Sequence, residues 1–223
     1  MKVTKITNLP IQSEGGGIYH IVKVDTDAGI SGLGEIGILN WSRTIANAVD
    51  HLGDLVIGEN PWETERLWQD MFRSSYWPAD LVYCCAMSAI DIALWDIKGK
   101  AANVPTYQLL GGPVREKVVC YPHIRGTSPE EIIEGSKKAV DEGWKYLRWG
   151  QPDALGEFKP NAITNYDQDK SVRVAVDLMG AVRQAVGPEI QLCFDVHTQL
   201  EIPQVVQMCR DLEEFKPYFI EDP

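Results

Sequence analysis

The sequence predicts two parts: an α+β unit over residues 1–113 and an α/β unit of (β/α)₈ barrel type over residues 114–223. In the first part, strand-like segments come before helix-like ones, which is typical of α+β units. After a break at residues 109–113 (LLGGP), strands and helices alternate, as in a parallel sheet with helical crossovers. The 110 residues after that break are close to half of the roughly 250 that a complete barrel needs, so we expect its first four strands.

Three short strands are expected at the N-terminus. Residues 2–9 and 18–24 form the first two, and residues 25–29 read as a turn into a third strand at residues 30–35. Gly32 and Gly34 in the third strand indicate a bend or a close approach of another backbone. Short connections of this kind predict an antiparallel meander.

Helices are expected next. Ser42 is a candidate N-cap for a helix that ends at Gly53, and Pro61 can open a second helix. The strongest helical pattern runs from about Asp80 to Lys100. Its apolar residues share one face: Met87, Ile90, Leu94 and Ile97.

Four strands alternate with three helices in the second part. The strands are expected at residues 118–121, 146–149, 190–196 and 218–221. Ser128 and Glu131 form a capping box for the first helix, which ends at Gly143. The alternative is a small doubly wound sheet, but no glycine-rich phosphate loop follows its first strand.

Composition excludes several partners. The net charge of −11 and the pI near 4.8 argue against nucleic acid and anionic membranes, which need a basic face. No apolar run approaches membrane-spanning length, and residues 1–10 hold no apolar signal core. The five cysteines form no C-x-x-C pair, which favours buried thiols in a reducing compartment. We therefore expect a cytoplasmic protein.

Acidic residues close the last two strands. Asp195 ends one apolar run, and Glu221 ends the next. Adjacent strands lie about 4.8 Å apart, and two carboxylates at that spacing suit Mg²⁺. Each acid has an alternative as a helix N-cap, but its repetition favours a metal site. His197 lies two residues after Asp195, so both side chains can face the barrel mouth, where an imidazole can transfer protons.

Further candidates come from the first two barrel strands and the loop after them. His123 and Arg148 can face the mouth, and Arg148 can bind a carboxylate with two hydrogen bonds or pair with a surface acid. Residues 150–170 show no clear pattern, and a segment of this length is functional or a floppy insertion. Tyr166 is its obvious proton-transfer group.

These residues resemble the enolase superfamily, in its mandelate racemase/muconate lactonizing group. The matching stretches are GISGLGE at 29–35, MSAIDIALWDIKGK at 87–100, YQLLGG at 107–112, DVH at 195–197 and EDP at 221–223. The resemblance implies a capping domain at 1–113 and a barrel domain at 114–223. It also implies Mg²⁺ held by Asp195, Glu221 and a third carboxylate from the next strand.

One difference from the motif of many group members indicates which branch the chain resembles. Many of its racemases and lactonizing enzymes carry Lys-x-Lys at the end of the second barrel strand, where this chain has Arg148. The chain resembles instead the mannonate dehydratase branch. That resemblance implies a hydro-lyase that removes the proton α to a carboxylate and eliminates the β-hydroxyl of an acid sugar. Arg148 and Tyr166 would act as base, His197 as acid, and Asn40 and His123 as substrate contacts.

Two alternatives stay open at this point. One is a racemase or epimerase of hydroxy acids in the same superfamily. The other is a catalytically incompetent fragment, because the third ligand and the fifth to eighth strands lie beyond residue 223. A half-barrel also exposes two sheet edges, which predicts a chain that aggregates, rearranges or pairs with another copy of itself.

Overall fold

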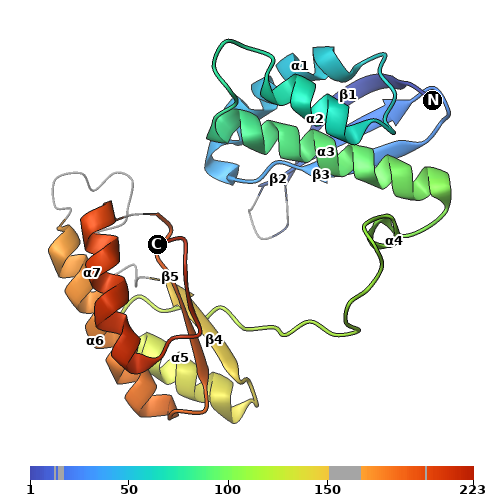
Figure 1. Ribbon diagram of the computed structural model, residues 1–223. Helices are drawn as coiled ribbons and strands as arrows, with labels where there is room; N and C mark the ends of the chain where they lie inside the picture. Colours follow the sequence, from blue (N-terminus) through green and yellow to red (C-terminus); the bar gives the residue numbers. More distant parts are fainter. Residues whose placement is uncertain (13, 15–17, 151–166, 199) are drawn as a thin grey trace. The chain divides into compact units, whose positions relative to one another are not determined.

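A computed structural model describes residues 1–223 except 13, 15–17, 151–166 and 199 (Figure 1). The chain divides into two compact units, Met1–Glu116 and Lys117–Pro223. Each unit has its own core of buried hydrophobic residues. The proposed domain boundary after residue 113 lies close to this division.

The first unit is an antiparallel sheet covered by helices on one face, which confirms the predicted meander. Along the middle strand, His20, Val22 and Val24 are buried, and the residues between them are partly exposed. The elements are β1 (Val3–Gln12), β2 (Ile18–Thr26), β3 (Ser31–Glu35), η1 (Leu39–Trp41), α1 (Ser42–Val56), α2 (Thr64–Phe72), α3 (Leu81–Ala102) and α4 (Thr106–Leu109).

The helix ends in this unit differ in part from expectation. The side chain of Asp80 accepts hydrogen bonds from the amides that open α3, as an N-cap should. Ser42 is instead the first residue of α1, and α1 continues past Gly53 to Val56. Pro61 does not open α2, because a turn closed by Glu63 N–H donating to Asn60 O at 3.1 Å precedes that helix.

The second unit is a parallel sheet in the order β4–β5–β6, with helices between successive strands. Ser128 Oγ accepts from Glu131 N at 3.3 Å, and the Glu131 carboxylate accepts from Thr127 N at 2.6 Å, close to the predicted capping box. The elements are α5 (Pro129–Asp141), β4 (Tyr146–Gly150), α6 (Gln168–Val186), β5 (Gln191–Asp195), α7 (Ile202–Leu212), η3 (Glu213–Phe215) and β6 (Phe219–Glu221).

The strand expected at residues 118–121 does not form among the described residues. Val118 and Val119 are 77% and 63% exposed, so their apolar side chains lack a partner layer. The chain reaches β4 only at a single parallel bridge between His123 and Arg148. The prediction of four barrel strands therefore becomes three strands and one bridge.

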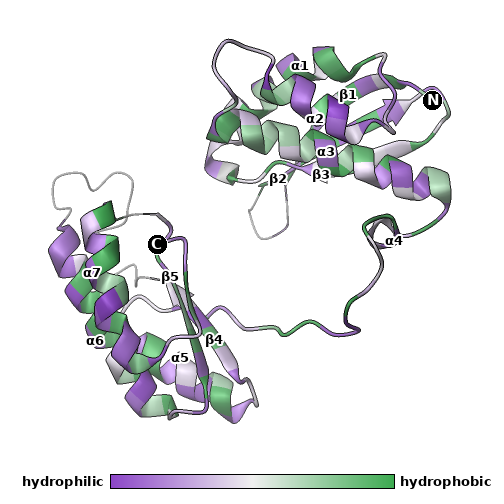
Figure 2. Cartoon of the chain, viewed as in Figure 1, coloured by the Kyte–Doolittle hydropathy of each residue, from purple (hydrophilic) through white to green (hydrophobic). Residues whose placement is uncertain are grey.

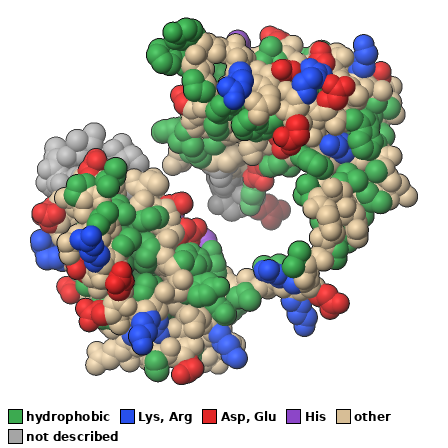
Figure 3. All heavy atoms as spheres, viewed as in Figure 1, with side chains coloured by type: hydrophobic (Ala, Val, Ile, Leu, Met, Phe, Trp, Pro, Cys, Tyr) green, Lys and Arg blue, Asp and Glu red, His purple; other side chains and the backbone are tan. Residues whose placement is uncertain are grey.

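Both units carry charged side chains on their surface. Figure 2 shows hydrophobic residues along much of α3 and a more polar stretch toward its C-terminal end. Acidic and basic side chains are interspersed over the face of each unit in Figure 3. No helix among the described residues has the length and apolarity that crossing a bilayer requires. Cys84 and Cys120 are exposed, so the expectation of buried thiols fails for these two.

Candidate functional site

The two faces of the parallel sheet differ in chemistry. Leu147, Trp149 and Phe194 point into the core beneath the helices, where each is at most 2% exposed. Side chains alternate along a strand, so Arg148 and Asp195 face the opposite side. The sequence pattern thus creates one apolar face that holds the unit together and one face that carries ionisable groups.

Asp195 and Glu221 lie directly opposite each other. The register of β5 and β6 pairs these two residues at the carboxyl ends of the strands. Asp195 is 1% exposed, whereas the Glu221 side chain is 32% exposed. Beyond the strands, Val196 N donates to Glu221 O at 3.0 Å, which keeps the two ends together.

Arg148 forms ion pairs with both carboxylates. Its Nη2 contacts Asp195 Oδ2, and its Nε donates to Glu221 Oε2 at 3.0 Å. A buried carboxylate needs such a partner, because an unpaired charge away from water is strongly destabilising. Arg148 Nη1 also lies 3.4 Å from His123 Nδ1, so the bridge between the two backbones continues through their side chains.

His197 lies in the turn that follows β5. Its backbone has φ of 55°, a left-handed conformation that costs free energy for a residue with a side chain. Its N–H donates to Asp195 Oδ1 at 3.1 Å, and its Nε2 lies 2.5 Å from Asp195 Oδ2. The imidazole is 64% exposed, so it contacts the buried acid on one side and solvent on the other.

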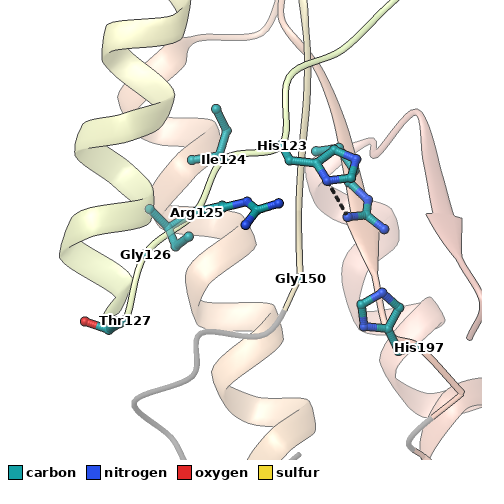
Figure 4. A pocket seen from close by; sticks show the side chains of 9 residues that line it. His123, Ile124, Arg125, Gly126, Thr127, Gly150 and His197 are labelled. Carbon is teal, nitrogen blue, oxygen red and sulfur yellow. Dashed lines mark hydrogen bonds between the residues drawn. The ribbon is translucent and has the colours of Figure 1, made fainter. Parts of the chain in front are cut away.

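A hollow of about 700 Å³ opens beside these groups (Figure 4). It is lined by backbone of the loop before α5 and by four ionisable side chains: His123, Arg125, Arg148 and His197. The described lining contains no acid, so the hollow favours an anionic ligand.

Cys193 is the one thiol on the ionisable face of the described strands. It lies opposite Arg148 in the register of β4 and β5. Burial, reinforced by the negative charge of Glu221 and opposed by Arg148, raises the pKa of the Cys193 thiol to about 11. The thiol is therefore protonated near neutral pH, the form that is a poor nucleophile.

The donor set fits part of a Mg²⁺ site. Asp195 and Glu221 present hard oxygen atoms from paired positions, which suits Mg²⁺. Among the described residues, no group of three or more His, Cys, Asp or Glu side chains is placed to hold a metal ion. Two carboxylates leave further positions for water, a substrate or another ligand.

The predicted site residues fall into three groups. The structure brings together His123, Arg148, Asp195, His197 and Glu221. Asn40 is exposed on η1 of the first unit, and its role as a substrate contact stays a prediction. Tyr166 lies outside the described residues. Sequence reasoning missed Arg125, although its place two residues after His123 repeats the spacing of Asp195 and His197.

Two family comparisons cover most of the chain. "Mandelate racemase / muconate lactonizing enzyme, N-terminal domain" matches residues 3–111, and "Enolase C-terminal domain-like" matches residues 132–223. The junction between the two matches falls between the two compact units.

Individual similar proteins include a sugar-acid dehydratase and solved enolase structures. D-galactonate dehydratase of Pectobacterium atrosepticum is 35% identical over the whole chain, which spans 55% of that relative. A solved enolase superfamily member from Salmonella Typhimurium is 30% identical, with a TM-score of 0.85, over 100% of this chain and 61% of its own. An enolase from Pantoea ananatis, solved with bound D-gluconate and magnesium, is 26% identical with a TM-score of 0.82, over 100% of this chain and 60% of its own.

Proposed function

Because the chain belongs to the mandelate racemase/muconate lactonizing group of the enolase superfamily, we propose that it functions in the Mg²⁺-dependent dehydration of an acid sugar. The reaction removes the proton α to the carboxylate, expels the β-hydroxyl as water and yields a 2-keto-3-deoxy acid. The observation that carries the proposal is the paired position of Asp195 and Glu221, with Arg148 and His197 beside them. The relatives named as a galactonate dehydratase and as a gluconate-bound enolase support the substrate class.

Asp195 and Glu221 would hold Mg²⁺. Its chemistry, when bound, is to stabilise negative charge that collects on the substrate carboxylate as the α-proton leaves. Arg148, together with Tyr166, is the proposed base, and it must release at least one carboxylate to reach the α-carbon. His123 would orient the substrate from the wall of the hollow, where its Nδ1 lies beside Arg148 Nη1.

His197 is the proposed acid. A departing hydroxyl needs a proton, and imidazole titrates close to neutral pH. Its contact with Asp195 orients the ring.

The experiment is turnover in D₂O of D-gluconate and D-galactonate with Mg²⁺, followed by NMR. We expect a 2-keto-3-deoxy product, which is lost when EDTA removes the metal. His197→Gln should still exchange the α-proton for deuterium but release no water, whereas Arg148→Gln should do neither.

Two results would contradict this proposal. Exchange without elimination in the unaltered chain would favour a racemase or epimerase. The absence of both exchange and product would favour a chain without catalytic competence.

A further inference from the structure

Arg125 is an exposed arginine on the wall of the hollow. Within the described part of the chain it forms no hydrogen bond or ion pair. Arg148, on the same wall, is engaged with Asp195 and Glu221. The hollow therefore contains one guanidinium that is neutralised and one that is not.

The backbone on either side of Arg125 is held in place. Ile124 N donates to Arg148 O at 2.8 Å, which ties this side to β4. On the other side, Thr127 N donates to the Glu131 carboxylate at 2.6 Å. A Cβ on Gly126 would lie 2.8 Å from Glu131 Cβ, so only glycine lets the loop pack this closely on α5. Arg125 thus projects from a fixed point.

The side chain extends into the hollow. Figure 4 shows Arg125 reaching from the α5 side toward Gly150, and Arg125 lines the same hollow as His123 and His197. This agrees with alternation, since Ile124 is buried and the residues on either side of it are exposed.

Neighbouring acids do not account for the charge. Glu131, Glu134 and Asp141 share a second, shallower hollow with Arg125, but none of the three forms an ion pair with it. Hydrogen bonds from the backbone and side chain of Thr127 engage the Glu131 carboxylate and lower its pKa. With no partner among residues 1–150 and 167–223 as the structure describes them, the guanidinium is available to a ligand.

Charge arithmetic indicates what that ligand carries. Asp195 and Glu221 contribute two negative charges and Arg148 one positive charge. His197, as the proposed acid, would add one positive charge, and Mg²⁺ would add two. With one substrate carboxylate this set carries one net positive charge, to which Arg125 adds a second. The third carboxylate ligand that the family resemblance implies would match only one of the two, which leaves one positive charge unmatched. A second anion on the substrate would match it.

We propose that Arg125 binds a second anionic group at the far end of the substrate, so that the site selects sugar acids with two anionic ends. This inference rests on the proposed function. The second group is a carboxylate or a phosphate ester, because a guanidinium fork binds both with paired hydrogen bonds. The monoanionic aldonates would then bind without this contact.

The test is titration calorimetry of the chain in Mg²⁺ buffer with three probes: D-gluconate, D-glucarate and 6-phospho-D-gluconate. We expect at least one dianion to bind roughly tenfold more tightly than D-gluconate, as one charge-assisted contact allows. Arg125→Gln should abolish that advantage and leave D-gluconate affinity unchanged. Arg125→Lys should keep part of it.

Arg173→Gln, at an exposed arginine of α6, is the matched control and should change no affinity. The inference is overturned if D-gluconate binds as well as both dianions, or if Arg125→Gln weakens all three probes equally. In that case the proposed function stands. If none of the three probes binds, the proposed function fails as well.

Discussion

Asp195 shows why a single residue matters to both stability and chemistry. Its carboxylate is almost completely buried, and two nitrogen-bearing side chains, Arg148 and His197, converge on the same oxygen. Breaking a buried pair by removing one partner leaves an uncompensated charge. The groups placed for catalysis are therefore also the groups that keep this acid tolerable in the folded state.

Arg148→Gln should lower the free energy of unfolding in EDTA by about 3 kcal/mol, because Asp195 then lacks its guanidinium. Asp195→Asn should cost a similar amount, and the double variant should cost clearly less than the sum. Urea denaturation measures all three. Arg173→Gln is the control and should stay within about 0.5 kcal/mol of the parent. Additive effects would show that the pair does not interact.

His20 gives a pH-dependent prediction. Burial in the first unit lowers the pKa of this imidazole from its usual 6.5, and the negative charge of Asp50 opposes the effect only in part. The unfolded chain therefore takes up a proton at a higher pH than the folded chain does. The contribution of His20 to stability is complete above about pH 6.5 and is lost as the pH falls toward the folded pKa.

Urea denaturation of the parent and His20→Gln between pH 5 and 8 isolates this contribution. The difference between their free energies of unfolding should be constant above about pH 6.5 and should move in favour of the variant at lower pH. A difference independent of pH would contradict the assignment.

At the residue scale, the sequence predicted functional side chains at strand ends better than functional side chains in loops. Asp195 and Glu221 follow from apolar runs that close on acids, and the register pairs them. Arg125 was missed because a lone arginine in a loop has no pattern of its own. Arg148 is engaged in ion pairs, whereas Arg125 has no partner among the described residues. This difference is what makes Arg125 significant.

At the scale of the elements, the closest backbone approach at a glycine is the one between β3 and α3. A Cβ on Gly34 would lie 1.9 Å from Ala89 O, and one on Gly32 would lie 2.0 Å from Ala93 O. The backbone of the strand therefore rests directly on the backbone of the helix. This confirms the close approach that the two glycines indicated in the sequence.

Gly34→Ala should lower the free energy of unfolding by at least about 3 kcal/mol, because neither backbone can move without disturbing the core. Gly37→Ala is the matched control. Its Cβ would meet nothing within 4 Å, so its effect should be below about 0.5 kcal/mol. Thermal and urea denaturation measure both. Equal effects of the two substitutions would rule out the backbone contact.

Periodicity predicted most elements, and its failures have physical causes. The four apolar residues predicted to share one face of α3, Met87, Ile90, Leu94 and Ile97, are all buried. Residues 118–121 are apolar but remain exposed, because a strand needs a neighbour to supply hydrogen bonds and cover. Only His123, farther along, meets β4. Local sequence does not encode where along a segment such pairing begins.

On the scale of the whole molecule, stability and function are divided between two cores. The first core joins the antiparallel sheet to α1, α2 and α3, and the second joins the parallel sheet to α5, α6 and α7. The chain spans 55–61% of the length of the relatives compared above. The second unit contributes the paired carboxylates, the arginine and the histidine to the proposed dehydratase site.

The most direct test of the central claim is titration calorimetry of the metal-free chain with MgCl₂ in the presence of D-gluconate. We expect saturable binding that Asp195→Asn and Glu221→Gln each abolish. Cys193→Ala, on the same sheet face but without a metal-binding role, should preserve it. Absence of binding by the unaltered chain, or binding that survives both carboxylate substitutions, would contradict the assignment of these strand ends as the metal site.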